Sequence, residues 1–444
     1  MTNVTRTAPA ANDPANRIGT RLAYGLPGLP LAMLGVPLYV YLPPFYAAQV
    51  GLGLAAVGTA LMLTRLFDVL SDPLIGYLAD RLPAAYRRRL MMLIGTPLLL
   101  FALHRLLLPP PAIGLAYLYG WALLAYLGWT MVTLPYQAWG AEATLNSHGR
   151  TRLATSREGF AIVGIVLAAA LPLLIGSEDP ARVLAAVAML VLVLLPLAVL
   201  LLFWRVPETS KPQPAQSWRT GLRLIRSQRA LRTLLGAHFL NSLANGLPAA
   251  LFILFVSHRL QVESALGPLL LLYFGAGVIA LPGWSLLARH LGKRLAWLAS
   301  VLLAASAFVV VPWLGPGDLL AFALVCLISG LSLGADLALP ASILGDLADE
   351  QSHTGLLFGL LGLVGKLALA IAVGLGFGLL ELSGFQGADT DSTGMLALLY
   401  GGVPVALKLL GGWLIWSPLG RHYRPATLTS AAAEPLPQSR QPLP

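Results

Sequence analysis

Three charged side chains stand close together inside one strongly apolar stretch of the chain. Arg65, Asp68 and Asp72 are spaced by three and four residues, and Ser71 directly precedes the second acid. At about 100° per residue, a helix places the three charges on one face within about two turns. Two carboxylates one turn apart repel each other unless a cation or a proton lies between them. The spacing therefore predicts a cation-binding site, with Arg65 balancing part of the negative charge.

The composition indicates that these charges lie in a membrane. The chain has 444 residues, of which 57% are hydrophobic and 11% are charged, against about 25% charged in an average soluble domain. A charge inside hydrocarbon costs at least about 2.5–3.5 kcal/mol. A purely structural network is the alternative, but two acids and one base leave one charge uncompensated. The single cysteine, Cys326, excludes an intrachain disulfide, and no histidine spacing suggests a metal site.

Apolar runs of about 20 residues, the length that crosses a bilayer, occur twelve times. Stretches such as Val183–Phe203 are apolar all round, whereas barrel strands would alternate apolar and polar residues. The expected fold class is therefore an all-α membrane protein with twelve transmembrane helices. The predicted spans are 22–46, 54–79, 90–108, 112–138, 154–176, 183–205, 230–257, 266–288, 295–314, 319–344, 356–382 and 395–416.

The lysines and arginines predict the orientation of these spans. Of the 29 basic residues, 23 fall on one side of the predicted membrane and three on the other, and the remaining three lie inside spans. An excess of basic residues marks the cytoplasmic side, so both termini are expected there. The same placement explains the net charge of +10 by contact with anionic lipid rather than with nucleic acid.

The chain reads as two similar halves. A polar cytoplasmic linker, 207–229, separates six spans in 21–206 from six in 230–420, and the ends 1–20 and 421–444 are expected to be disordered cytoplasmic segments. Leu134-Pro135 with Gly140 recurs as Leu339-Pro340 with Gly345, 205 residues later, and Pro73 with Ala79 recurs as Pro282 with Ala288. Two pseudo-symmetric six-helix bundles with a substrate site between them describe the major facilitator plan.

The motifs also resemble a known family. The run from Arg65 to Gly76 is similar to the second-span signature of the glycoside–pentoside–hexuronide:cation symporters, the melibiose permease group of the major facilitator superfamily. This resemblance implies that Asp68 and Asp72 bind Na⁺ or H⁺, assisted by Ser71 and Thr130, and that Lys366 connects the cation and substrate sites. It continues through Leu134–Glu142, Arg150-Thr-Arg152 with Arg157, and Asp346–Asp349 followed by Gly355 and Lys366.

The sugar-binding positions of that family are changed here. A Lys-Asp pair in the first span appears as Leu31-Ala32, and an acid in the fourth span appears as Thr133, while Arg157 and Lys366 remain. An anionic or zwitterionic amphiphile, such as a lysolipid or a fatty acid, is therefore the alternative to a sugar. A non-transporting scaffold is a second alternative, but it leaves the charged second span unexplained.

Further charged residues complete the predicted machinery. Asp336 is expected to pair with Lys366 or to contact substrate. Lys408 lies mid-span, where a lysine can extend along its helix to the membrane surface, and it is assigned no role. Substrate and coupling residues are thus Arg157, Lys366, Thr133 and Asp336. The cytoplasmic gate is predicted to consist of Asp80, Arg81, Glu142, Arg150 and Arg152.

No Walker loop, nucleophile elbow or redox motif occurs in the sequence, so neither an enzyme nor an ATP-driven pump is predicted. The prediction is a cation-coupled secondary active transporter that works by alternating access. We expect a monomer in a bacterial inner (plasma) membrane, with a small-molecule substrate, no nucleic-acid partner, and no cofactor besides the coupling Na⁺ or H⁺.

Overall fold

The structure is a computed structural model that describes residues 17–81, 86–143, 147–207, 223, 225–349, 354–385 and 393–417. Almost all of these residues are helical, and no strand occurs among them. The first six spans are α1 (Ile18–Gly25) with α2 (Gly28–Met33), η2 (Pro37–Tyr41), α3 (Leu42–Pro44) and η3 (Phe45–Gln49), then α4 (Leu54–Arg81), α5 (Arg87–Leu107), α6 (Leu115–Glu142), α7 (Ser147–Ile175) and α8 (Pro180–Arg205).

The second six spans repeat this plan. They are α10 (Arg229–Leu254) with η4 (Phe255–Leu260), η5 (Glu263–Ala265) with α11 (Leu266–Leu291), α12 (Lys293–Val309) with η6 (Val311–Trp313), α13 (Leu319–Asp349), α14 (Thr354–Leu382), and α15 (Thr393–Ala397) with η7 (Leu398–Gly402) and α16 (Val403–Trp416). The first spans of the two halves both end in a π-helical segment, η3 and η4.

Twelve helical segments are long and apolar enough to cross a membrane, which confirms the predicted fold class. The first span begins at Ile18, four residues before its predicted start, and the apolar part of the second span ends at Asp72, seven residues before its predicted end. Residues 18–20 form the first turn of α1, although they fall in the segment predicted to be disordered. The rest of that segment, the tail 421–444 and most of the linker 207–229 lie outside the described residues.

Prolines explain why the first span is broken into short pieces. Pro27 precedes α2 and Pro37 begins η2. Because proline has no backbone N–H and its ring clashes with the preceding turn, it interrupts the helical hydrogen bonds. The interruption leaves short α- and π-helical pieces in a span that borders both bundles.

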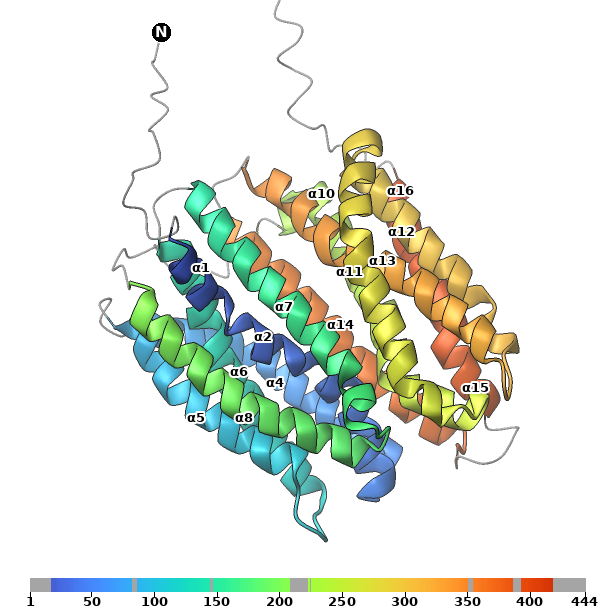
Figure 1. Cartoon of the computed structure of the whole chain (residues 1–444). Helices are drawn as coiled ribbons and strands as arrows, with labels where there is room; N and C mark the ends of the chain where they lie inside the picture. The colour runs from blue at the N-terminus through green and yellow to red at the C-terminus, as the bar shows by residue number, and fades with distance from the viewer. Residues whose placement is uncertain are drawn as a thin grey trace, which may run out of the picture.

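The two halves form two bundles that lie beside each other (Figure 1), with the blue-to-green helices on the left and the yellow-to-red helices on the right. The extensive helix–helix contacts between them are α4 against α14 and α7 against α11. These pairs join the second span to the eleventh and the fifth to the eighth. In the internal repeat the second span corresponds to the eighth and the fifth to the eleventh, so the two contacts are equivalent.

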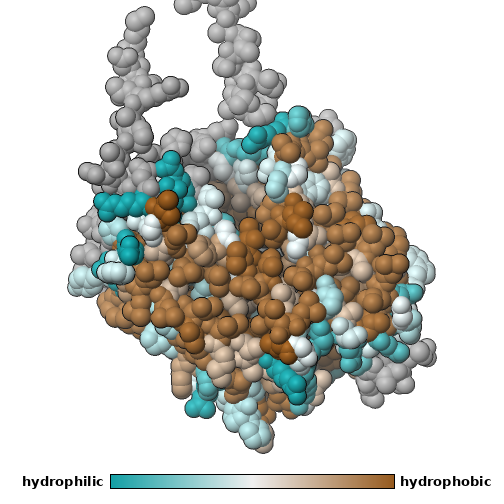
Figure 2. Space-filling view, viewed as in Figure 1, coloured by the Kyte–Doolittle hydropathy of each residue, from teal (hydrophilic) through white to brown (hydrophobic). Residues whose placement is uncertain are grey.

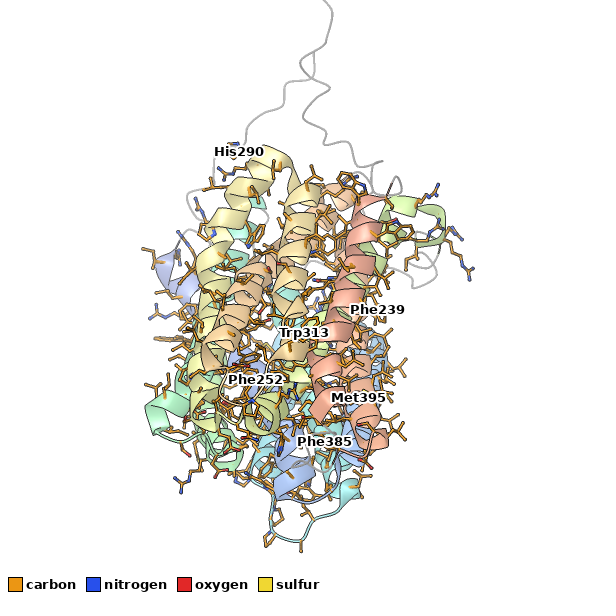
Figure 3. The ribbon with its side chains drawn as sticks, turned by 90° about the vertical axis from the view of Figure 1, so that its right-hand side faces the viewer. Phe239, Phe252, His290, Trp313, Phe385 and Met395 are labelled. Carbon is orange, nitrogen blue, oxygen red and sulfur yellow. The ribbon has the colours of Figure 1, made fainter. Side chains whose placement is uncertain are left out.

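The hydrophobic core joins the bundles at one end only. We call the end that carries the 50–53 and 176–179 loops the loop end, and the opposite end the linker end. One cluster contains loop-end residues of both bundles, among them Tyr46 and Leu266. A separate cluster, which includes Leu235 and Trp297, fills the linker-end half of the C-terminal bundle and contains residues of that bundle alone. Figure 3 shows the molecule from the side, with His290 near the linker end and Phe385 near the loop end.

Large apolar side chains cover the middle of the outer surface. Figure 2 shows a brown belt across the molecule, with teal patches above and below it. Ile279, Leu70 and Val193, each near the middle of its helix, are 78%, 72% and 59% exposed. So much exposed apolar surface is unfavourable in water but is the expected boundary with lipid. The protein is therefore a multi-pass membrane protein.

Candidate functional site

The acids of α4 meet one base and one hydroxyl from two other helices. Lys366 of α14 places Nζ 2.9 Å from Asp68 Oδ2 and 2.7 Å from Asp72 Oδ2. Thr130 of α6 places Oγ1 2.8 Å from Asp68 Oδ1 and 2.9 Å from Asp72 Oδ1. The two carboxylates thus share both partners. Since Lys366 belongs to the C-terminal bundle, this cluster also joins the bundles.

The cluster lacks one positive charge. Lys366 supplies one charge against the two carboxylates, and Asp68 is only 4% exposed. The Thr130 hydroxyl has a single hydrogen, so it donates to one carboxylate at a time. A proton on the other carboxyl group would let that group donate to the Thr130 oxygen. One proton or one monovalent cation would therefore satisfy both the charge and the hydrogen-bonding groups.

Arg65 makes no hydrogen bond to these acids, so its charge-balancing role stays a prediction. Its guanidinium lies over the ring of Tyr39, 3.8 Å from the ring centroid. None of its nitrogens has a hydrogen-bond partner among the described residues, and the residue is 3% exposed. Lys366 occupies the carboxylate oxygens instead, because α14 packs directly on α4. Stacking of a desolvated guanidinium on an aromatic ring stabilises it by about 2 kcal/mol.

The other two predicted hydroxyl groups, those of Ser71 and Thr133, form hydrogen bonds within their own helices. Ser71 donates to the backbone oxygen of Asp68 at 3.0 Å, and Thr133 donates to the backbone oxygen of Trp129 at 2.9 Å. Ser71 keeps its acceptor lone pairs but lies against the helix backbone. Of the predicted cation and substrate residues, the structure therefore brings together only Asp68, Asp72, Thr130 and Lys366.

Arg157 lies away from this cluster and pairs with the neighbouring Glu158. On α7 its Nη2 is 2.6 Å from Glu158 Oε1, and its side chain is 25% exposed. A Cβ added to Gly28 would lie 2.8 Å from the Arg157 backbone oxygen, so α2 passes close to α7 here. The described contacts place Arg157 at the α2–α7 junction and do not join it to Lys366.

A second buried polar cluster lies within the C-terminal bundle. Asp336 of α13 accepts hydrogen bonds from the Asn245 amide at 2.8 Å and from the Trp297 indole at 3.2 Å. Lys408 of α16 donates to the amide oxygens of Asn241 and Asn245, at 2.9 and 2.8 Å. One amide group therefore separates the carboxylate from the ammonium.

This cluster corrects the predicted pairing of Asp336 and supplies partners for Lys408, to which the sequence assigned no role. Asp336 does not pair with Lys366, because the α4 acids already bind that ammonium. Lys408 does not extend toward the membrane surface, since it is completely buried. The signal that could have revealed the cluster is the pair Asn241 and Asn245, which stand four residues apart in an otherwise apolar span. Polar side chains inside a span need partners, and residues at this spacing share a helix face.

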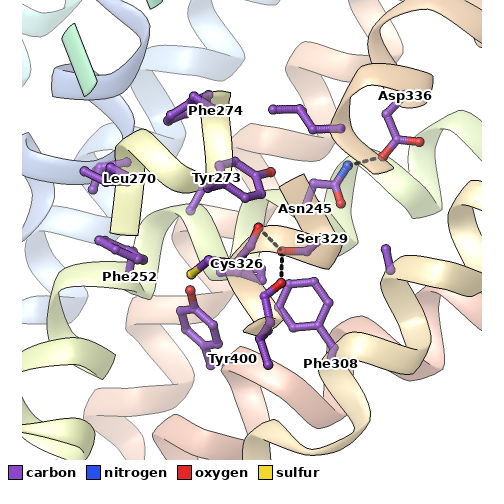
Figure 4. Close-up of a pocket in the computed structure, with 16 residues that line it drawn as sticks. Asn245, Phe252, Leu270, Tyr273, Phe274, Phe308, Cys326, Ser329, Asp336 and Tyr400 are labelled. Carbon is purple, nitrogen blue, oxygen red and sulfur yellow. Dashed lines mark hydrogen bonds between the residues drawn. The ribbon is translucent and has the colours of Figure 1, made fainter. Parts of the chain in front are cut away.

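A small cavity of about 60 Å³ lies beside this cluster. Its wall is mainly apolar, with five aromatic residues among the 16 that line it, and Asn245 and Asp336 form one polar side of it (Figure 4). Val40 of the first span lines it from the N-terminal bundle, so the cavity borders both halves. The aromatic lining residues are Phe252, Tyr273, Phe274, Phe308 and Tyr400.

At the loop end, two glutamates each bind the N-terminus of a helix in the other bundle. Glu178, between α7 and α8, accepts a hydrogen bond from the backbone N–H of Gly267, the second residue of α11, at 2.9 Å. Glu381, near the end of α14, accepts one from the N–H of Ala55, the second residue of α4. A helix N-terminus has free N–H groups and favours negative charge. We call these two contacts the loop-end clamps.

The comparisons with known proteins establish the family. The model of the MFS/sugar transport protein family matches residues 23–417. The chain belongs to this family. An uncharacterized symporter of Synechocystis sp. is 35% identical over 37% of the chain, which spans about a third (32%) of that relative. The sodium-dependent lysophosphatidylcholine symporter 1-A of Danio rerio is 23% identical, over 89% of this chain and 84% of its own.

Solved structures show the same fold. The nucleoside transporter NupG has a TM-score of 0.66 and 16% identity, covering 89% of this chain and 99% of its own. The predicted membership of the major facilitator superfamily is therefore confirmed. As a member of a symporter family, the protein is a secondary transporter and not an enzyme.

For this MFS/sugar transport family member, the cytoplasmic gate stays a prediction. The side chains of Asp80, Arg81, Glu142 and Arg150 lie outside the described part of the structure. Arg152 is described and lies exposed on α7. The described closure of the bundles is at the opposite end, where the loop-end clamps lie.

Proposed function

We propose that the protein is a cation-coupled symporter whose coupling ion binds between Asp68 and Asp72. The observation that carries this proposal is the shared position of Lys366 and Thr130 on both acids, which leaves one negative charge uncompensated. A charge deficit inside a membrane protein is costly. An entering Na⁺ or H⁺ removes it.

The origin of Lys366 in the other bundle connects ion binding to movement. Without the ion, the ammonium of Lys366 holds both acids of α4 and so ties the bundles together. The entering ion competes for the same carboxylate oxygens and weakens this tie. Alternating access then proceeds by rocking of one bundle against the other, as expected for two repeats around a central site.

The cavity favours an amphiphile over a sugar as substrate. Each unpaired buried polar group costs about 1–3 kcal/mol, so a bound sugar requires many donors and acceptors. The mainly apolar wall beside Asp336 offers few of them. Apolar groups pack against such a wall better than hydroxyls do, and similarity to a lysophosphatidylcholine symporter over most of the chain supports an amphiphile.

We further propose the orientation that the basic residues indicate. With both termini in the cytoplasm of a bacterial inner membrane, the loop end is periplasmic. The common core and the clamps then close the periplasmic side, and the molecule is inward-facing. A monomer suffices for this cycle, because both bundles and both acids belong to one chain.

Purified protein in liposomes tests the function directly. We expect a radiolabelled lysolipid to accumulate when a Na⁺ or a pH gradient is imposed, and not when both gradients are absent. Uptake of a radiolabelled neutral disaccharide is measured in parallel as the competing substrate. Gradient-driven uptake of the disaccharide that excess disaccharide abolishes and lysolipid does not would establish a sugar symporter instead.

A further inference from the structure

The C-terminal bundle presents only the negative half of its charge pair to the cavity. Asp336 lines the cavity, whereas Lys408 is completely buried and does not belong to the lining. Asn245 stands between them. The arrangement is therefore a fixed dipole whose carboxylate end faces the space in which a substrate can lie.

The hydrogen bonds fix the direction of this dipole. The Asn245 amide oxygen accepts from Lys408, so its NH₂ group must face Asp336 and donate to it. The second oxygen of Asp336 accepts from the Trp297 indole. Both donors are neutral, and the described residues contain no ion pair to this carboxylate. With about four lone-pair sites, the carboxylate keeps acceptor capacity for a further ligand.

We propose that Asp336 and Asn245 form the site for a positively charged group of the substrate, an amine or a quaternary ammonium. This inference rests on the proposed function, because it adds the charge of the head group to the class of amphiphile. The carboxylate attracts the cation, and Lys408 behind it keeps the empty site electrically balanced. Loss of Asp336 would therefore change which head group is selected, not which ion drives transport.

The walls of the cavity suit the same ligand. Tyr273 lies beside Asn245 in Figure 4, whereas Phe274 and Tyr400 lie on the side of the view opposite Asp336. Aromatic ring faces attract cations, and quaternary ammonium groups in particular. The same rings pack against methylene groups. A positive group at Asp336 and apolar groups beside it would thus contact one continuous lining.

A pair of lysolipids that differ only in one charge tests the proposal. One carries phosphocholine, and the other carries its 3,3-dimethylbutyl analogue, in which carbon replaces the nitrogen and the shape is preserved. In liposomes with the wild-type protein, we expect gradient-driven uptake of the choline form to exceed that of the analogue by about tenfold, as for one lost charge contact. Equal uptake of the two would overturn the proposal without any variant.

Variants then assign the preference to Asp336. Asp336→Asn should lower choline-form uptake to the level of the analogue and leave analogue uptake within about twofold, whereas Asp336→Glu should retain the preference. Asp346→Asn is the matched control, since this acid lies on the same helix but pairs with Lys293. A preference that survives in Asp336→Asn would place the head group elsewhere. If the wild type accumulates neither lysolipid, the amphiphile function itself fails, which is a different outcome from equal uptake.

Discussion

The two bundles handle buried charge in different ways. In the N-terminal bundle, two acids of α4 contact one ammonium directly, and that ammonium comes from the other bundle. In the C-terminal bundle, one acid and one ammonium are separated by an amide, and all partners belong to the same bundle. The first cluster is short of a positive charge, and the second is balanced.

This difference separates coupling from recognition. Removing one partner of a buried ion pair destabilises a protein by about 3–5 kcal/mol, so a cross-bundle pair can resist or drive bundle movement. The balanced cluster of Asp336 and Lys408 experiences no such change, because its bundle moves as one body. We therefore expect the ion to act on α4 and α14, while the C-terminal cluster keeps its geometry through the cycle.

The largest effect should come from the acids of α4. Asp68→Asn or Asp72→Asn removes the charge deficit, since Lys366 then neutralises the remaining carboxylate. Accumulation of substrate against its gradient should be abolished, while downhill exchange of substrate across the liposome membrane continues. Asp346→Asn should accumulate substrate as the wild type does. A charge-neutral variant of either acid that still accumulates substrate would show that the ion binds elsewhere.

Replacing the two lysines should separate coupling from stability. Lys408 is completely buried, and Lys408→Met leaves the amide oxygens of Asn241 and Asn245 without their donor, at a cost of about 1–3 kcal/mol. Lys366→Met leaves two carboxylates without their base, and because the Asp68 side chain is only 6% exposed, water replaces little of that contact. Thermal unfolding should therefore show a lower Tm for both variants, whereas uptake assays should show loss of coupling for Lys366→Met alone. Loss of coupling to the same extent in Lys408→Met would contradict the comparison.

The sequence alone predicted the spans and the two acids of the N-terminal cluster. Hydropathy predicted twelve spans, and helical periodicity placed Asp68 and Asp72 on one face. Periodicity within one span cannot show which of several basic residues reaches that face. The contact between Lys366 and Asp72 joins residues 294 positions apart, and it depends on the packing of α4 on α14. Arg65 is closer in sequence, yet it stacks on Tyr39.

The C-terminal cluster was missed for a related reason. Lys408 was considered alone, and a single lysine in a span can extend along the helix to the membrane surface. Its true partners, Asn241 and Asn245, lie on α10, and neutral amides attract less attention than charged residues. Only the packing of α10 against α16 brings these groups together.

At the loop end the two bundles are equivalent, which gives a smaller and symmetric prediction. Glu178→Ala and Glu381→Ala each remove one clamp, so both should shift the population toward opening at the loop end. A single cysteine at Leu254, which is 4% exposed, should react faster with a water-soluble thiol reagent in both variants, after Cys326 is replaced. The double variant should react fastest. Faster reaction in only one single variant would show that the clamps are not equivalent.

The smallest effect is a pH dependence at one clamp. Burial raises the pKa of Glu178 above its usual range, and the N–H of Gly267 offsets only part of that shift. The closed state therefore binds a proton more tightly than an open state in which water reaches this carboxyl group. Its contribution to closure is fully present below the ordinary pKa and is lost as pH rises through the raised value. Reactivity of the cysteine at Leu254 should thus increase as the pH rises from the ordinary pKa of a glutamate to the raised pKa of Glu178.

Two variants assign this pH dependence to Glu178. Glu178→Gln keeps an oxygen that can accept from Gly267 but carries no charge, so the loop end should stay closed and the pH dependence should be abolished. Glu381→Gln should retain the pH dependence. Closure that strengthens as pH rises would show that the attraction to the α11 N-terminus outweighs the cost of burying the charge.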